Sequence, residues 1–268
     1  MNSNLFEKLI SIIKFAGNAI LDIYNSNLDI KYKEDKSPLT DADRRAHKII
    51  EEGLRSFSDY PILSEEGKNI SFKKRKNWKY FWLVDPLDGT KEFIKRNDEF
   101  TVNIALIYKD QPILGIVYAP AKSIIYYGSK ESGAFKIENE KNIKLNLKNN
   151  PVKDHLAVVS SKSHLNEETK DFIRFLENYY DKIRTVSIGS SLKICLVAEG
   201  KADIYPRLAP TMEWDTAAAH AVLKAAGGRI VKYSKTKDLK DLNKLPELEY
   251  NKPNLINPYF IALRPNVF

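Results

Sequence analysis

A strand that ends in two carboxylates constrains this chain more than any other feature of its sequence. The apolar run 80–84 is followed at once by Asp85 and Asp88, with Pro86 between them and Gly89 after them. Proline fixes its own φ and biases the preceding residue toward extended geometry, and glycine permits a turn that a side chain would obstruct. We therefore expect the two carboxylates to be held at the end of a buried strand rather than on a mobile loop.

This turn has a structural and a chemical interpretation. An Asx-type turn that closes the strand would account for Asp85 and Asp88 without any further role. Alternatively, hard divalent cations need several oxygen ligands at about 2.0–2.6 Å, and two carboxylates with a backbone carbonyl such as that of Leu87 can supply three. The turn alone leaves both interpretations open.

The chain before this strand predicts two helices. Residues 5–24 place their apolar side chains on one helical stripe. Residues 29–40 are polar and are predicted as a loop, after which Thr40 or Asp41 is expected to cap a second helix. Asp43 is then expected in the first turn of that helix, where the helix dipole favours a carboxylate.

The chain around and after the strand predicts a mainly antiparallel sheet and then α/β units. A short strand is expected over 61–64, and β-rich segments separated by turn residues cover 101–108, 113–118, 123–128 and 133–137. The polar stretch 138–153 is the candidate boundary between two subdomains, 1–150 and 151–268. Beyond it strands alternate with helices, the last of which is predicted to run from Asp215 to Ala226. The fold class is therefore expected to be α/β (α+β).

Length and cysteine content set simple bounds. A chain of 268 residues can form one large core or two packed subdomains. Its single cysteine, Cys195, excludes an internal disulfide and sits in an apolar pattern, so we expect a small core residue. Charged residues within the first predicted helix exclude a signal peptide or a membrane span there, and the cytoplasm is the expected compartment.

The net charge indicates an anionic partner. The chain carries a formal charge of +8 and has a pI near 9.2, which suits a phosphorylated metabolite, a nucleic acid or a membrane surface. The basic stretch 73–76 and the lysines between 136 and 153 carry no interleaved aromatic residues, so we interpret them as solvated surface. Nucleic acid is not expected as the primary partner, whereas peripheral attachment of a basic surface to anionic lipid stays open.

Acidic residues recur in separated segments, and each has a plain structural account; Asp215, for example, could simply cap a helix. Considered together they suggest more, because two hard metals about 3.5–4 Å apart require carboxylates from several parts of a chain. The candidate residues are Asp43, Glu65 with Glu66, Asp85 with Asp88, and Asp215.

These residues carry a family resemblance. The stretches 85–90 and 214–218 together resemble the two signatures of the inositol monophosphatase superfamily, and 63–66 fits as well. Further stretches, 91–96, 99–107, 190–193 and 196–200, are similar to its bacterial cytoplasmic 3′(2′),5′-bisphosphate nucleotidase branch. The resemblance implies a layered αβαβα sandwich that hydrolyses a phosphate monoester with two or three Mg²⁺ ions and is inhibited by Li⁺.

The resemblance also implies a role for individual residues. Metal ligands would be Glu65, Asp85, the carbonyl of Leu87, Asp88 and Asp215, with Glu65 also counted as catalytic. Thr90 and Asp43 would orient and deprotonate the attacking water, and the amides of Gly89 and Thr90 would hold phosphate oxygens. Ser190 would bind the substrate, and Lys193 and Arg207 would contact the nucleotide's second phosphate, with solvated surface charge as the alternative for the two cations. Ser163 and His164 would approach the base or ribose, although an exposed loop histidine is the simpler account of His164.

The sequence thus predicts removal of the 3′-phosphate of adenosine 3′,5′-bisphosphate, with 3′-phosphoadenylyl sulfate as a second substrate. The products would be AMP and phosphate, and the reaction would recycle a by-product of sulfur assimilation. The same chemistry on inositol phosphates or sugar bisphosphates is the nearest alternative. A non-catalytic binder of nucleotides or RNA is a third, against which the intact pair of Asp43 and Thr90 argues, since a binder needs no water-activating group.

Overall fold

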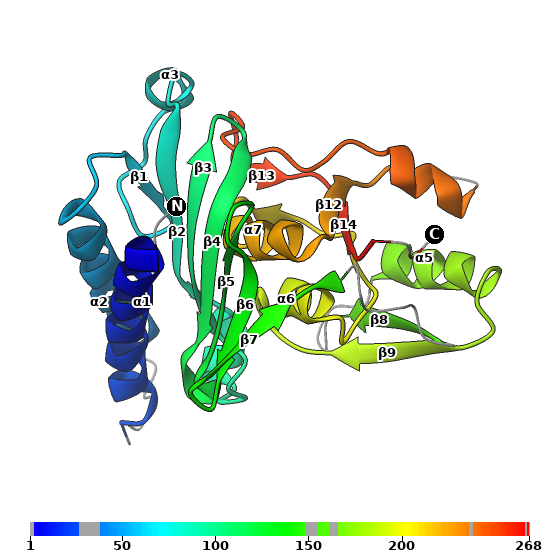
Figure 1. Cartoon of the computed structure of the whole chain (residues 1–268), viewed down its shortest axis with the longest axis horizontal. Helices are drawn as coiled ribbons and strands as arrows, with labels where there is room; N and C mark the ends of the chain where they lie inside the picture. Colours follow the sequence, from blue (N-terminus) through cyan, green and yellow to red (C-terminus); the bar gives the residue numbers. More distant parts are fainter. Residues whose placement is uncertain are drawn as a thin grey trace.

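The chain folds into five layers. The computed structural model describes residues 3–26, 38–147, 155–160, 166–235, 238–265 and 267, and the structural statements below concern these residues. Figure 1 shows a helix pair, a sheet, a second helix pair, a second sheet and an outer helical layer in succession. The expected α/β class and the αβαβα sandwich are therefore confirmed.

Two amphipathic helices form the first layer, α1 (Ser3–Tyr24) and α2 (Pro38–Arg55). The first agrees with the prediction. The second begins at Pro38, so the prediction of a loop to residue 40 with a cap at Thr40 or Asp41 is wrong. Proline lacks the N–H that the first helical turn leaves unbonded, and its fixed φ suits that turn. As a consequence Asp43 lies in the second turn of α2 rather than in the first.

A seven-stranded sheet forms the second layer. β1 and β2 are parallel, and every later pair of neighbours is antiparallel and consecutive in the chain. Its strands are β1 (Ile62–Ser64), β2 (Tyr80–Asp88), β3 (Thr101–Tyr108), β4 (Gln111–Ala119), β5 (Ile124–Ser129), β6 (Gly133–Glu138) and β7 (Lys141–Leu145). The predicted meander is confirmed, but β7 lies inside the stretch predicted to be only a polar boundary. An edge strand pairs through its backbone and needs few apolar side chains, and four of the five residues of β7 are exposed.

Helices α6 (Leu192–Glu199) and α7 (Ala217–Ala226) form the third layer, between the two sheets. Helix α7 lies against β3, β4, β5 and β6. It begins at Ala217, not at Asp215 as predicted, because the Asp215 carboxylate does not cap the helix and instead accepts a hydrogen bond from the Met212 N–H (3.0 Å).

A five-stranded sheet and its outer helices complete the sandwich. The strands are β8 (Leu156–Ser160), β9 (Ile183–Ser187), β10 (Ile204–Arg207), β12 (Arg229–Lys232) and β14 (Phe260–Leu263), in the order β12-β14-β10-β8-β9. The outer face carries α5 (Glu167–Glu177) and the 3₁₀ helix η3 (Leu239–Lys244). Short connecting elements are α3 (Phe72–Arg75), α4 (Thr90–Ile94), η1 (Pro120–Lys122) and the strand pair β11 (Thr211–Met212) and β13 (Ile256–Asn257).

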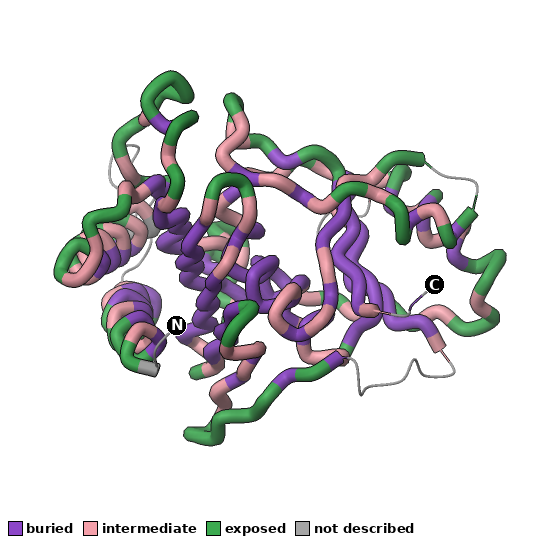
Figure 2. Tube along the Cα trace, turned by 45° about the horizontal axis from the view of Figure 1, so that its top comes forward, coloured by how far each residue is buried: buried purple, intermediate pink, exposed green. Residues whose placement is uncertain are grey.

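Both faces of the first sheet are buried, and this explains why β2 reads as a continuous apolar run. Trp82 and Val84 belong to the core beneath α1 and α2, whereas Phe81 and Leu83 belong to the core around α6 and α7. Figure 2 shows these strands as the buried centre of the molecule. Cys195 is buried in the same second core, as predicted. The division at residue 150 stays a prediction.

Two cations predicted to lie on solvated surface are in fact buried. Lys136 is 2% exposed, and its Nζ contacts Glu138 (2.8 Å) and Glu199 (2.9 Å). Arg75, in the basic stretch 73–76, is 1% exposed and donates hydrogen bonds to the segment 251–253. Charge patterning along a sequence does not reveal a partner that is distant in the chain.

No helix among the described residues is long and apolar enough to cross a membrane.

The close approach of α7 to β4 at Gly115 yields a stability prediction. A Cβ on Gly115 would lie 2.1 Å from the carbonyl oxygen of Ala218, so Gly115→Ala must push α7 away from the sheet. We expect the free energy of unfolding to fall by about 1–3 kcal/mol, measured by urea denaturation.

Gly53→Ala is the matched control. Its added Cβ would meet only the side chain of Ile12, which can change rotamer, and alanine favours a helix over glycine. We expect the control to stay within about 1 kcal/mol of the wild type. Equal stability of the two variants would show that α7 can move off β4 without cost.

Candidate active site

The end of β2 is shaped as the sequence suggested. Asp85 is buried, and its Oδ1 accepts a hydrogen bond from the Leu87 N–H (3.1 Å), which is the Asx-type turn. The pairing of β2 with β3 shifts register between Asp85 and Asp88. Gly89 has a φ of +94° and forms the N-cap of α4, a conformation that glycine adopts readily. The Asx-type turn uses only one oxygen of Asp85. The second oxygen is left for another role, so a structural turn and a cation ligand are compatible interpretations of this residue.

Asp88 is held from the neighbouring layer. Its Oδ2 accepts hydrogen bonds from the Ser191 N–H (2.5 Å) and, more weakly, from the Thr101 hydroxyl (3.4 Å). The Ser191 hydroxyl in turn donates to Asn103 Oδ1 (2.8 Å). The carboxylate of Asp88 is thereby tied to the residue that precedes α6. Sequence reasoning missed Thr101 and Asn103, because a polar side chain inside an apolar strand carries no local sign of its partner.

Parallel pairing brings Glu65 to the same edge of the sheet. Ser64 pairs with Val84, and the Glu65 N–H donates to the carbonyl of Val84 (3.2 Å). Since parallel strands end together, Glu65 follows β1 at the level where Asp85 follows the apolar part of β2. Helix α2 is attached here as well, because His47 Nδ1 lies 2.9 Å from the Ser64 hydroxyl.

The predicted acids influence one another electrostatically. Burial raises the pKa of Asp43 to about 8, and the charges of Glu66 and Glu65 add to the shift. Burial likewise raises the pKa of Asp215 to about 7, with Asp88 as the strongest neighbouring charge. The pKa of each of the other three is also raised, first by burial: Glu65, Asp85 and Asp88. The structure therefore gathers these separated segments into one acidic cluster.

This cluster is not closed around a preformed ion site. Within the described ranges, no three or more His, Cys, Asp or Glu side chains are already grouped so that they could hold a metal ion. Like-charged carboxylates repel one another until a cation is present, so we expect small side-chain movements on loading.

Cations line the cavity next to these acids. Asp88 and Asp215 border a cavity of about 300 Å³ whose wall also contains Lys193, Arg207 and Tyr205. Burial lowers the pKa of Lys193, whereas the nearby charge of Asp88 opposes that shift. Lys193 Nζ lies 5.9 Å from the centre of the Tyr205 ring, an aromatic neighbour that sequence reasoning also missed.

Arg207 has one buried donor without a hydrogen-bond partner among the described residues. One of its terminal nitrogens, Nη2, donates to the Pro210 carbonyl (3.1 Å), but its Nε is buried and has no hydrogen-bond partner among the described residues. Ser190 precedes the same helix as Lys193 and has a φ of +50°, an uncommon conformation for serine.

The remaining predicted residues lie in different situations. Thr90 is exposed at the start of α4, and within the described part of the chain no hydrogen bond joins it to Asp43. Gly89 and Thr90 line the cavity. Ser163 and His164 lie outside the described residues, so their predicted approach to the base or ribose stays a prediction.

The chain is similar to known proteins along most of its length. The profile of the Inositol monophosphatase family matches residues 1–261. A Salmonella typhimurium protein named 3′(2′),5′-bisphosphate nucleotidase CysQ is 45% identical over 229 residues, which are 84% of this chain and 89% of that protein. A Haemophilus influenzae protein of the same name is 35% identical over 276 aligned residues, which cover 100% of this chain and 96% of that protein. The crystal structure of CysQ from Bacteroides thetaiotaomicron has a TM-score of 0.87 and 43% identity, covering 96% of each chain.

The raised pKa values lead to a prediction for metal binding. A carboxyl whose folded pKa exceeds its unfolded value stabilises the fold below the unfolded pKa, and that contribution is lost as pH rises toward the folded pKa. For Asp43 and Asp215 this loss extends to about pH 7–8, and a divalent cation offsets it by neutralising the cluster. Mg²⁺ should therefore raise the melting temperature more near pH 8 than near pH 5.5, measured by calorimetry.

The control for this measurement is Na⁺ at equal ionic strength, which screens exposed charges but does not bind as a hard divalent ion. An equal Mg²⁺ effect at both pH values would contradict the assignment of the acidic cluster as the ion site.

Proposed function

The chain belongs to the inositol monophosphatase family, and we propose that it is a metal-dependent phosphomonoesterase that removes the 3′-phosphate of adenosine 3′,5′-bisphosphate. The products are AMP and phosphate, 3′-phosphoadenylyl sulfate is a second substrate, and the reaction recycles a by-product of sulfur assimilation. The proposed compartment is the cytoplasm. This proposal rests on family membership, on relatives named 3′(2′),5′-bisphosphate nucleotidase, and on the charge arrangement of the cavity.

The observation that carries the nucleotide assignment is the presence of cations beside the acids. The reacting phosphate needs the metal-binding acids, whereas a second phosphate on the same substrate needs its own cations. Lys193 and Arg207 border the cavity on which Asp88 and Asp215 lie, and Arg207 Nε is a buried donor with no partner among the described residues. Leaving such a donor unsatisfied costs about 1–3 kcal/mol, which an anionic acceptor on the substrate would offset.

The acidic cluster fits hard divalent cations. Asp85, Asp88 and Asp215 each accept a backbone hydrogen bond on one carboxylate oxygen, so the second oxygen can serve as a ligand. We propose that these three residues, with Glu65 and the carbonyl of Leu87, hold two or three Mg²⁺ ions, and that Li⁺ inhibits. Bound Mg²⁺ supplies charge neutralisation on the phosphate and leaving oxygen and lowers the pKa of the attacking water.

The chain's own residues position and deprotonate that water. A deprotonated carboxylate is a stronger base when its surroundings raise its pKa, and burial together with the charges of Glu66 and Glu65 raises the pKa of Asp43. Thr90 would orient the water toward Asp43. The two residues are not hydrogen-bonded to each other in the described structure, but such contacts often tighten only when the substrate is bound. Phosphoryl transfer then depends on positioning and charge, with no covalent intermediate on the protein.

A charge-removing substitution tests the metal role of Asp88. Asparagine at this position keeps the shape and one acceptor oxygen for the Ser191 N–H but loses the negative charge, so Asp88→Asn should lower turnover by more than about tenfold at saturating Mg²⁺. Phosphate release from adenosine 3′,5′-bisphosphate measures it, with circular dichroism to show that the fold survives.

Inositol 1-phosphate and fructose 1,6-bisphosphate are the comparison substrates for the wild type. Turnover of either at a rate equal to or above that of the nucleotide would reject the nucleotide assignment. Wild-type-like turnover of Asp88→Asn would reduce Asp88 to a turn residue.

Removal of one cation separates recognition of the second phosphate from chemistry. A charge-assisted hydrogen bond to phosphate contributes roughly 1.5–3 kcal/mol, or about ten- to a hundredfold in affinity. Lys193→Ala or Arg207→Ala should therefore lower kcat/KM for adenosine 3′,5′-bisphosphate by that factor. The kcat/KM for adenosine 3′-monophosphate, which lacks the second phosphate, should stay nearly unchanged.

Lys201→Ala is the control, because Lys201 is an exposed lysine that pairs with Glu199 and does not line the cavity. Equal losses on both substrates in the Lys193 or Arg207 variants would show that these cations serve the reacting phosphate or the fold.

A further inference from the structure

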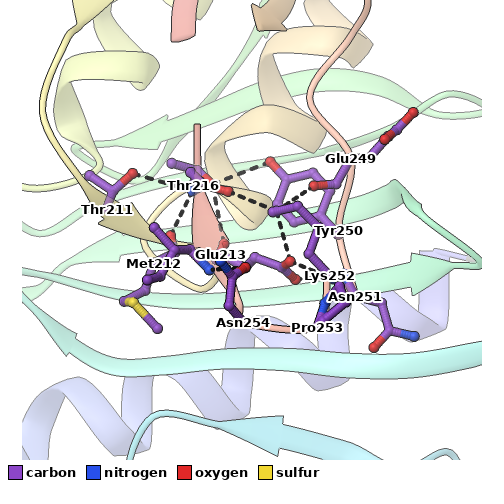
Figure 3. Close-up of polar contacts among 12 residues, drawn as sticks. Thr211, Met212, Glu213, Thr216, Glu249, Tyr250, Asn251, Lys252, Pro253 and Asn254 are labelled. Carbon is purple, nitrogen blue, oxygen red and sulfur yellow. Dashed lines mark hydrogen bonds and ion pairs between the residues drawn. The ribbon is translucent and has the colours of Figure 1, made fainter. Parts of the chain in front are cut away.

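Glu213 is a fully buried carboxylate that no step above uses. It is 0% exposed and lies two residues before Asp215. Its Oε2 accepts a hydrogen bond from the Asn251 N–H (2.6 Å), and its Oε1 accepts one from the Lys252 N–H (2.8 Å). The ammonium of Lys252 lies 2.7 Å from the same Oε1. Figure 3 shows Glu213 facing the segment 249–254 with these contacts.

The backbone of Glu213 fixes the start of the turn that carries Asp215. Its N–H donates to the Leu255 carbonyl (2.9 Å), and its own carbonyl accepts from the N–H groups of Thr216 (3.2 Å) and Ala217 (3.1 Å). Asp215 therefore lies in a turn anchored at its first residue by both the side chain and the main chain of Glu213. Only the side-chain anchor can be removed by substitution.

The segment that receives Glu213 is itself clamped by Arg75 of α3. Arg75 Nη1 donates to Asn251 Oδ1 (2.7 Å), and Nη2 donates to the carbonyls of Lys252 (2.7 Å) and Pro253 (2.9 Å). Asn251 returns a hydrogen bond from Nδ2 to the Arg75 carbonyl (2.9 Å). Arg75 Nε also donates to the Ile70 carbonyl (3.3 Å), five residues after Glu65, and Arg75 borders a cavity together with Glu65 and Trp214, so these contacts connect the chain near Glu65 to the chain near Asp215.

We propose that Glu213 is a positioning residue that, through the segment 251–253 and Arg75, holds Asp215 at the distance from Glu65 that metal binding requires. The inference rests on the proposed function of Asp215 as a metal ligand. Carboxylates contributed by separate segments bind one ion well only if those segments keep a fixed separation.

The test compares two substitutions of buried carboxylates. Glu213→Gln keeps the volume but loses the ion pair with Lys252, and its amide NH₂ must face one of the two backbone N–H donors. Asp203→Asn is the matched control: Asp203 is also buried, pairs with Arg264 (2.9 Å) and accepts from the Ala157 N–H (2.7 Å), but it does not contact the turn of Asp215.

The readout is the Mg²⁺ concentration that produces half of the full thermal shift, measured without substrate. Loss of a partner that orients a metal ligand weakens affinity about 10- to 100-fold. We expect that increase for Glu213→Gln and no increase for Asp203→Asn, even where both melt at a lower temperature than the wild type. The Mg²⁺ concentration for half-maximal phosphate release should rise by the same factor.

Arg75→Lys provides a second, independent variant. Lysine keeps the charge but cannot contact the Lys252 and Pro253 carbonyls and Asn251 together, so the Mg²⁺ midpoint should rise again. An unchanged midpoint in Glu213→Gln, or an equal rise in Asp203→Asn, overturns the positioning role. If Glu213→Gln does not fold, the Mg²⁺ midpoint of Arg75→Lys decides whether the network has a positioning role. If neither variant folds, the network serves stability alone, and the positioning role is overturned.

The wild-type measurement separates this inference from the proposed function. A wild-type protein whose melting temperature does not respond to Mg²⁺ overturns the proposed function, and the positioning role with it. A normal wild-type response with an unchanged Glu213→Gln midpoint overturns the positioning role only.

Discussion

Repulsion among neighbouring carboxylates is the constraint on which the rest of this structure depends. Asp43, Glu65, Asp85, Asp88 and Asp215 come from separate parts of the chain, and burial raises the pKa of every one of them. A fold minimising its own free energy would separate or expose such groups. They stay together because each is attached to a rigid element: a helix, the parallel pair β1 and β2, or a turn held through Glu213 by hydrogen bonds from residues 251 and 252. Stability is thereby given up to keep these acids close to one another.

The five-layer architecture makes this arrangement possible. With helices on both faces of the first sheet, β2 is buried along almost its whole length, and its end opens toward the layer that contains α6 and α7. The residues that precede these two helices, Ser191 and Asp215, thus reach the carboxylates of β2. The cavity is lined by Asp88 from the end of β2 and by Asp215, Lys193 and Arg207 from the second half of the chain, so it forms where the layers meet.

Local features of the site were predictable from the sequence, and long-range ones were not. The turn at Asp85, the left-handed glycine at 89 and most strands follow from proline, glycine and apolar patterning, which act within a few residues. Arg75 was read as solvated because its neighbours are lysines, yet its partners lie 176 to 178 positions away. Glu213 looks like an ordinary acid next to a signature, and only the fold shows that it receives two backbone N–H groups from 251 and 252. Two predicted helix starts were wrong: α2 begins at Pro38, before the expected caps at Thr40 or Asp41, and the Asp215 carboxylate accepts the Met212 N–H instead of starting α7.

The hydrogen bond from the Ser191 N–H to Asp88 has a thermodynamic consequence. Asp88 belongs to the acid cluster, and Ser191 directly precedes the helix that carries Lys193, so the two halves of the cavity share one hydrogen bond. A change in the position or charge of Asp88 alters the anchorage of α6, and a ligand that draws on Lys193 acts back on Asp88. Binding free energies coupled in this way are reciprocal: if Asp88 holds the metal and Lys193 the nucleotide, as we propose, whatever affinity the nucleotide gains from the bound metal, the metal gains from the nucleotide. Product release and weakened metal affinity then become two aspects of one equilibrium.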